Sequence, residues 1–396
     1  MKLVFKKDDL LNAINIVSRA IPTRTTNPIL ECILFDAAGA SIQLVANDTD
    51  LGIETEVEGS ILESGKVALD AKLISEIIRK CDKGDSEIII SCDENYLAVI
   101  KSDNSVFKIQ GRDGEEFPYL PEIEKENYIS ISQFTLKEVV RQTIFAAAPN
   151  DNNKMMGGEF IEVNNDSVKF TTLDGHRIAI RKIMMKDSYG IFNAIVPVRS
   201  LNEISKIVSG DNEKEIIIHF SKNHLLFEFD NTRVICGIIE GEYFRISHMI
   251  SNDHDTKVTI NKSELISNID KSMIFVRESD HKPIILNISG NQMNISIKSS
   301  FGTMDGDIMC HKEGNDLKIA FNPKFLIDAL RAIDDEEVNL YFTNSKSPCF
   351  IKDENEKYIY LILPVKVSSL GERKRNPYLQ GPPLLLCLTR NYACLT

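Results

Sequence analysis

The segment LVFKKDDLL at residues 3–11 has two counterparts further along the chain, ISISQFTL at 129–136 and VTINKSEL at 258–265. Each copy combines a short β-like stretch with a following pattern of helical spacing. Leu10, Leu136 and Leu265 occupy equivalent positions in the three copies. A long-period repeat of this kind indicates that three related units make up the chain.

Each repeat contains a second passage from strand to helix, and a β-rich stretch follows it. The passages are VALDAK at 67–72, IVPVR at 195–199 and AFNPK at 320–324. Two such passages per repeat predict an α+β domain with two helices packed on one side of an antiparallel sheet and solvent on the other side. We expect helices at 7–20, 71–83, 133–148, 198–209, 262–277 and 323–333.

The repeat places three domains at residues 1–126, 127–254 and 255–367. Residues 368–396 do not follow the pattern: they begin with the linker-like SSLGERKRNP at 368–377 and continue with a short apolar run at 381–388. This run is too short to span a bilayer. We interpret residues 368–396 as a disordered or non-native tail, with a functional tail as the alternative.

Composition excludes several classes of protein. The chain has 396 residues and a formal net charge of -12, so the protein as a whole should repel nucleic acids and anionic membranes, and any such contact needs a local basic patch. Its eight cysteines form no C-x-x-C pair, which favours a reducing compartment and core or surface thiols. No apolar stretch has the length of a signal peptide or a membrane helix. We therefore expect a cytoplasmic protein.

The second helix of each repeat carries a pair of basic residues seven positions apart, which returns to nearly the same helix face. The pairs are Lys72 with Arg79, Arg199 with Lys206, and Lys324 with Arg331. One such pair alone is most simply a solvated helix face, with Glu76, Glu203 or Asp328 as an intrahelical partner. Recurrence on three equivalent helices favours weak, sequence-independent contact with phosphates.

The segment FTTLDGHRIAI at 170–180 predicts a hairpin with an Asp-Gly turn. Asp174 and His176 could suggest a hydrolytic or transfer enzyme, which we keep as an alternative hypothesis. A catalytic set also needs a nucleophile or a metal in reach, and the histidines and cysteines have no metal-ligand spacing. No phosphate-binding loop, dinucleotide fingerprint or hydrolase elbow occurs. We expect no catalysis, no metal and no cofactor.

Three features together resemble one family: the threefold repeat, DGHR at 174–177 and LPV at 363–365. They are similar to the bacterial sliding clamps, the beta subunits of DNA polymerase III, over residues 1–367. The resemblance implies the DNA clamp fold and a head-to-tail homodimeric ring that encircles duplex DNA as a non-catalytic processivity factor. It also implies binding of the polymerase III catalytic subunit, the clamp loader, other polymerases and repair proteins. A static DNA-binding protein remains a further alternative.

The resemblance also assigns site residues. The DNA-contacting loop residues correspond to Arg24 and Asn150, which join the six basic helix residues. The subunit contact places Phe107 and Ile109 against Ile274 and Phe275, although all four could belong to the core of their own domain. The pocket for partner peptides corresponds to Met156, Leu173, Gly175, His176, Arg177, Ile178, Met249, Asn322, Phe325, Lys346, Leu361, Leu363, Pro364 and Val365. Phe244 departs from the family pattern, in which a proline is usual.

Overall fold

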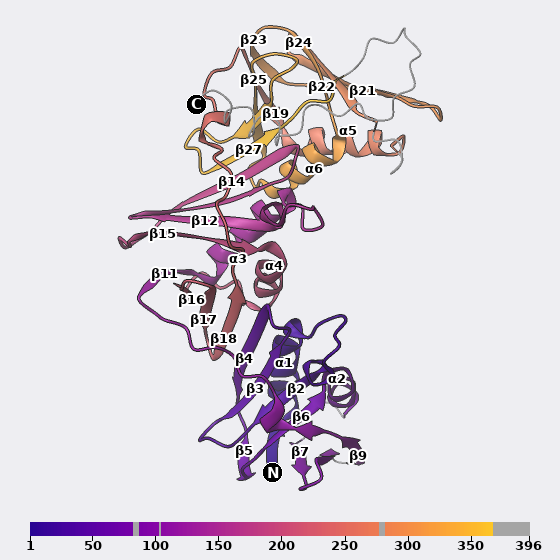
Figure 1. The fold of residues 1–396 in the computed structure, drawn as a ribbon. Helices are drawn as coiled ribbons and strands as arrows, with labels where there is room; N and C mark the ends of the chain where they lie inside the picture. Colours follow the sequence, from indigo (N-terminus) through magenta and orange to yellow (C-terminus); the bar gives the residue numbers. More distant parts are fainter. Residues whose placement is uncertain (82–86, 103, 277–281, 367–396) are drawn as a thin grey trace. The chain divides into compact units, whose positions relative to one another are not determined.

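The computed structural model describes residues 1–81, 87–102, 104–276 and 282–366. Within these residues the strand–helix plan occurs three times (Figure 1). The expected tail at 368–396, together with Val367, lies outside the described residues. The three domains expected at 1–126, 127–254 and 255–367 are used below as names for the repeats.

The described elements follow the same order in each repeat, with small additions. The first repeat contains β1 (Lys2–Lys6), α1 (Lys7–Val17), β2 (Cys32–Asp36), β3 (Ile42–Asn47), β4 (Leu51–Val57), β5 (Ser60–Glu63), β6 (Lys66–Asp70), α2 (Ala71–Lys80), β7 (Glu87–Cys92), β8 (Leu97–Ser102), β9 (Ser105–Gln110) and β10 (Arg112–Asp113). The second contains β11 (Asn127–Ser132), α3 (Gln133–Thr143), β12 (Gly158–Asn164), β13 (Ser167–Leu173), β14 (Arg177–Met184), β15 (Ile191–Pro197), α4 (Val198–Ile207), β16 (Glu215–Phe220), β17 (His224–Phe229) and β18 (Thr232–Gly237). The third contains β19 (Thr256–Asn261), α5 (Lys262–Met273), β20 (Ile284–Ser289), β21 (Gln292–Lys298), β22 (Thr303–Met309), β23 (His311–Gly314), β24 (Leu317–Phe321), α6 (Pro323–Ala332), β25 (Glu337–Phe342), β26 (Cys349–Lys352) and β27 (Tyr358–Ile362).

The six described α-helices begin where the sequence predicts them, either directly after a strand or with one residue between, and four of them start at a capping residue. The side chains of Asp70, Ser132, Asn261 and Asn322 accept hydrogen bonds from backbone N–H groups in the first turn of α2, α3, α5 and α6. Such caps satisfy donors that a helix start leaves open. Among the described residues, no helix combines the length and the apolar character that crossing a bilayer requires.

The chain forms two compact units, and the second repeat contributes to both. The first unit comprises residues 1–137 and 199–238. It contains a five-stranded sheet, β5-β1-β7-β8-β9, and a nine-stranded sheet, β10-β6-β2-β3-β4-β18-β17-β16-β11. The nine-stranded sheet runs from the first repeat into the second through antiparallel pairing of β4 with β18.

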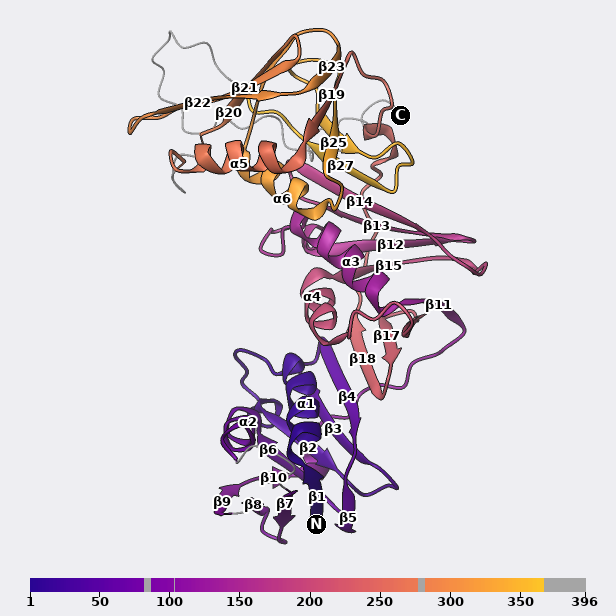
Figure 2. The same ribbon diagram turned by 180° about the vertical axis from the view of Figure 1, so that it is seen from behind.

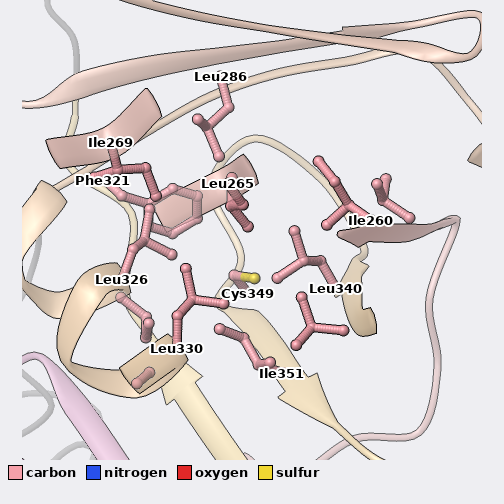
Figure 3. Packing of buried hydrophobic residues seen from close by; sticks show 14 of the residues in the cluster. Ile260, Leu265, Ile269, Leu286, Phe321, Leu326, Leu330, Leu340, Cys349 and Ile351 are labelled. Atoms are coloured by element: carbon pink, nitrogen blue, oxygen red, sulfur yellow. The ribbon is translucent and has the colours of Figure 1, made fainter. Parts of the chain in front are cut away.

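The second unit comprises residues 138–198 and the described residues that follow Ile238. Its nine-stranded sheet, β15-β12-β13-β14-β27-β26-β25-β19-β23, joins the second repeat to the third through β14 and β27, and β22-β21-β20-β24 forms a smaller sheet. Helices α5 and α6 contact each other, as Figure 2 shows. Between them and the sheets lies an apolar core that includes Leu265, Phe321, Leu330 and Ile351 (Figure 3).

The sheet face opposite the helices is not simply solvated, so that expectation was wrong. In the second unit this face carries Leu173, Ile178 and Leu361, which are buried beneath Tyr243 and Ile246 from the stretch after β18. In the first unit, Phe117 and Leu120 from the stretch after β10 pack on a second outer cluster. The segments that connect successive repeats therefore use apolar side chains to cover the outer faces.

Glu159 on β12 is the one fully buried carboxyl group among the residues that the structure describes. Its Oε1 lies 2.5 Å from the Thr143 hydroxyl at the end of α3, and that hydroxyl also donates to the Val139 carbonyl at 2.7 Å. Burial raises the pKa of Glu159 to about 8, whereas the Thr143 contact lowers it. A single hydroxyl proton cannot serve both acceptors. A protonated Glu159 resolves the conflict because it can donate to the Thr143 oxygen.

We expect Glu159→Gln to stabilise the protein at neutral pH. The folded pKa of about 8 exceeds the ordinary value of 4.5, so folding stability falls as pH rises from 4.5 to 8 and is level outside that window. At pH 7 the free energy of unfolding of the variant should exceed that of the parent by about 3 kcal/mol. Near pH 4 the two free energies of unfolding should be equal. Urea denaturation at both pH values measures this. A variant that is no more stable at pH 7 would contradict the neutral acid.

Candidate functional site

An apolar cluster on the outer face of the second unit brings most of the predicted pocket together. Met156, Leu173, Ile178 and Leu361 belong to this cluster and are at most 3% exposed. Met249 and Leu363 pack against it while remaining partly exposed. Leu363 is the continuation of β27, where its backbone N–H donates to the His176 carbonyl at 2.9 Å. The buried residues therefore form a floor, and the partly exposed ones offer apolar surface.

The β13–β14 turn forms one wall of a hollow beside this floor. Asp174 accepts hydrogen bonds from the backbone N–H groups of His176 and Arg177 at 2.7 and 2.9 Å, which fixes the turn through Gly175. The hollow measures about 820 Å³. It is lined by Ala148, Asp151, Asn152, Asn153, Lys154, Met156, Asp174, Gly175 and His176.

Sequence reasoning missed the polar part of that lining. Residues 149–154 read PNDNNK, a composition typical of a loop between a helix and a strand. This signal could have drawn attention to the loop, but nothing in the sequence shows that the loop lies beside His176. The loop lies beside His176 because Met156, which follows the loop, packs against the β13–β14 hairpin.

The third repeat supplies the remaining pocket residues with different roles. The His176 ring stacks on Phe325 of α6, with centroids 5.8 Å apart. Asn322 caps α6, and Val365 donates to the Ala320 carbonyl at 2.8 Å. Lys346 is exposed on the turn between β25 and β26 and does not line the hollow.

Phe244, the departure from the family pattern, is partly buried against the same apolar cluster. Its ring meets Tyr243 edge to face, with centroids 5.6 Å apart. Phe244 and Tyr243 also line a separate hollow of about 400 Å³ together with Phe160. The aromatic ring thus contributes to packing of the segment that covers the sheet.

The turn carries no recognisable catalytic arrangement. The Asp174 carboxylate is bound to the Arg177 guanidinium at 3.0 Å, and the His176 ring faces Phe325. Within the residues that the structure describes, no three His, Cys, Asp or Glu side chains gather as metal ligands would. The geometry therefore offers no support for the alternative of a hydrolytic enzyme.

The basic pairs on the second helices are exposed, but acidic neighbours neutralise part of their charge. Arg199 pairs with Asp48 at 3.2 Å, Lys206 with Glu203 at 2.6 Å, and Arg331 with Asp270 at 3.3 Å. Lys72 and Lys324 have no ion pair within the described part of the chain, and Arg79 donates to the Ser75 hydroxyl. Arg24 and Asn150 are exposed outside the helices and strands.

The four predicted subunit-contact residues differ in exposure. Ile274 is 79% exposed at the end of α5, whereas Ile109 on β9 is 8% exposed. Phe107 is half-buried, and Phe275 packs against the core of the third repeat. Val106 on β9, Met309 on β22 and Phe301 just before β22, which sequence reasoning missed, are also more than half exposed.

Comparison with known proteins gives a consistent result along the whole described chain. Models of the DNA polymerase III beta subunit match in order: the N-terminal domain at residues 1–121, the central domain at 130–244 and the C-terminal domain at 247–366. A beta sliding clamp of Staphylococcus epidermidis is 31% identical over 377 residues, covering 92% of this chain and 99% of that protein.

Solved structures agree. One is the crystal structure of a protein from Eubacterium rectale described as a DNA polymerase III beta subunit. It is 52% identical to this chain with a TM-score of 0.89, and the match covers 92% of this chain and 99% of that one. The DNA polymerase sliding clamp of Bacillus subtilis is 29% identical with a TM-score of 0.89, covering 93% and 100% of the two chains.

Two leucines two positions apart test the division between floor and open surface. Leu361 is 1% exposed, so Leu361→Ala should lower the free energy of unfolding by about 2–5 kcal/mol through the cavity it leaves. Leu363→Ala should lower it by less than about 1.5 kcal/mol because that side chain already faces solvent in part. Urea denaturation followed by circular dichroism compares them. Equal losses would place Leu363 in the core.

Proposed function

Because this chain belongs to the DNA polymerase III beta subunit family, the sliding clamps, we propose that two copies close head to tail into a ring around duplex DNA. The protein is a non-catalytic processivity factor in DNA replication. We further propose which strands close the ring, which residues face DNA and which pocket binds partner proteins. With DNA as its partner, the ring belongs in the cytoplasm, on the nucleoid.

One observation supports the closure of the ring. Two equivalent pairings of edge strands, here called joints, connect successive repeats inside the chain, and one strand equivalent to each side of these joints remains without such a partner. The order of elements shows which strands are equivalent. The third strand after the first helix of each repeat is β4, β14 or β22, and the third strand after the second helix is β9, β18 or β27. β4 pairs with β18 and β14 pairs with β27, both antiparallel. Among the described strands, β22 and β9 each have one neighbour only. A second copy can supply both missing partners.

The two remaining edges suit each other chemically. β9 exposes Val106 and Lys108, and β22 exposes Asp305, Asp307 and Met309. Pairing them would cover apolar side chains, place opposite charges across the joint and remove open sheet edges that invite aggregation. Ile274, which is exposed at the end of α5 in the same repeat as β22, would add an apolar contact to the second copy.

The two internal joints also predict the register of the third. Gly52 lies opposite Ile235 in the first joint, and Ile178 lies opposite Leu361 in the second. Gly52 and Ile178 each pair with the last residue of the preceding strand, as Thr303 does in β22. This makes Thr303 their equivalent.

On the other side of the joint, Ile235 and Leu361 stand three residues after the starts of β18 and β27. The equivalent position in β9, which starts at Ser105, is Lys108. The inferred register therefore sets Thr303 opposite Lys108 and Met304 opposite Phe107, with Lys108 diagonally adjacent to Asp305 on the outer face.

A cysteine pair tests this register directly. Phe107→Cys with Met304→Cys should give a covalent dimer under mild oxidation, because directly opposed residues have their Cα atoms about 4.5–5.5 Å apart, within the range that a disulfide spans. Lys108→Cys with Met304→Cys is the matched control, since Lys108 points to the opposite face of the sheet. A non-reducing gel separates the outcomes. Equal cross-linking of both pairs, or none in a folded protein, would reject the joint.

We place the DNA-facing surface on the second helices, supported by their exposed basic residues at equivalent positions: Lys72, Arg79, Arg199, Lys206, Lys324 and Arg331. Arg24 and Asn150 would add contacts from loops. Partial neutralisation by Asp48, Glu203 and Asp270 leaves a weak positive field in a chain of net charge -12. Such a field attracts phosphates without holding them firmly, as sliding requires.

Charge reversal on these helices should weaken contact with DNA while the dimer persists. Lys72→Glu, Arg199→Glu and Lys324→Glu together should reduce loading onto DNA severalfold at physiological salt, because phosphate contacts contribute cooperatively to encounter. Lys186→Glu, Lys222→Glu and Lys318→Glu make the same change in net charge at exposed positions away from helices. Sedimentation checks the dimer. Equal loss in both variants would mean that only net charge matters.

The fourteen pocket residues form the proposed docking site for a short peptide from the polymerase III catalytic subunit, the clamp loader, other polymerases and repair proteins. The buried apolar floor and the adjoining hollow support this assignment, since anchor pockets combine apolar depth with a polar rim. All the lining elements lie within the second unit.

A further inference from the structure

Arg177 uses three of its five N–H donors on groups of the protein itself, one from each nitrogen. Its side chain is 9% exposed. Nε donates to Asp174 at 3.0 Å, Nη1 to Asp328 at 2.7 Å, and Nη2 to the Phe145 carbonyl at 2.6 Å. Two donors remain, but the guanidinium is nearly buried and held at all three nitrogens, so it offers a bound peptide little accessible surface. Arg177 therefore serves another purpose than direct contact.

The guanidinium lies over two aromatic rings, one of which belongs to the proposed pocket. Its central carbon is 4.5 Å from the Phe325 centroid and 5.5 Å from the Phe145 centroid. Phe325 also stacks with His176. A planar cation held over a ring face attracts the ring and limits its orientations. The position of Phe325 is thus tied to the position of the guanidinium.

Asp328 connects this arrangement to the helix that carries Phe325. It stands three residues further along α6, so Asp328 and Phe325 lie on neighbouring positions of one helix face. The Asp328 side chain is 25% exposed and reaches Arg177 on β14. The ion pair therefore fixes the cation from the same helix on which the ring is mounted.

We propose that Asp328 is a positioning residue for partner binding: through Arg177 it sets the orientation of Phe325 in the peptide pocket. The inference rests on the proposed pocket. Asp328 itself belongs neither to the apolar cluster nor to the lining of the hollow. Asp174 also holds Arg177, but it fixes the backbone of the turn as well, so Asp328 is the carboxylate whose effect on the ring can be isolated.

The test titrates a fluorescein-labelled peptide from the matching polymerase III catalytic subunit against full-length variants. Asp328→Asn keeps the side-chain shape but removes the charge that holds Arg177, and should weaken binding roughly fivefold. Asp334→Asn is the matched control: Asp334 also pairs with an arginine, Arg141 at 2.8 Å, but does so just beyond the end of α6. Its affinity should equal that of the parent.

A double-mutant cycle distinguishes positioning from a general structural effect. In a Phe325→Leu background, Asp328→Asn should produce no further loss of affinity, because the ring through which it acts is gone. If Asp328→Asn weakens binding equally in both backgrounds, or leaves the parent's affinity unchanged, the proposal is overturned. If Asp328→Asn unfolds the protein, Asp328→Glu replaces it: the retained charge should keep affinity near the parent's, and a fivefold loss there would equally overturn it.

A separate variant tests the pocket on which the inference depends. Met156→Ala with Pro364→Ala should abolish binding of the same peptide by removing apolar surface at two sides of the site. If that variant binds like the parent, the pocket is misplaced and the positioning role falls with it. If it loses binding while Asp328→Asn does not, the pocket stands and only the role of Asp328 is rejected.

Discussion

Pairing of edge strands between successive repeats is the interaction on which the rest of this structure depends. An open edge presents free backbone groups, and the chain closes four such edges internally in two joints, β4 with β18 and β14 with β27. These joints make two nine-stranded sheets out of three repeats. They also explain why the second repeat contributes to both compact units. The proposed pairing of β9 with β22 of a second copy extends the same interaction and requires no new kind of contact.

The placement of charge follows from this scaffold. The basic residues recur at equivalent positions of the second helices, in a chain whose formal net charge is -12. Ion pairs with Asp48, Glu203 and Asp270 reduce the helix charge further. Exposed pairs of this kind add little stability, but they weaken the positive field around these helices. Retention on DNA must then come from closure around it, because electrostatic attraction alone is lost as salt rises.

Much of the fold was predictable from the sequence because its signals are local. Strand endings at Asp70, Asn261 and Asn322 combine β-pattern, cap and helical spacing within a few residues. What could not be predicted depends on contacts distant in sequence. Asp328 was expected to serve basic residues of its own helix, yet it binds Arg177, 151 positions away. Burial of the outer sheet face by Tyr243 and Leu120 likewise depends on how connecting segments fold back.

Retention of the protein on circular and linear DNA tests the central claim most directly. After loading by the matching clamp loader onto a nicked circular plasmid, the protein is washed at about 1 M salt, where charges are screened beyond about 3 Å. A closed ring should remain on the circle and leave once a restriction enzyme linearises it. Equal release from intact and linearised plasmid at that salt concentration would contradict closure around DNA and would leave phosphate contacts as the basis of binding.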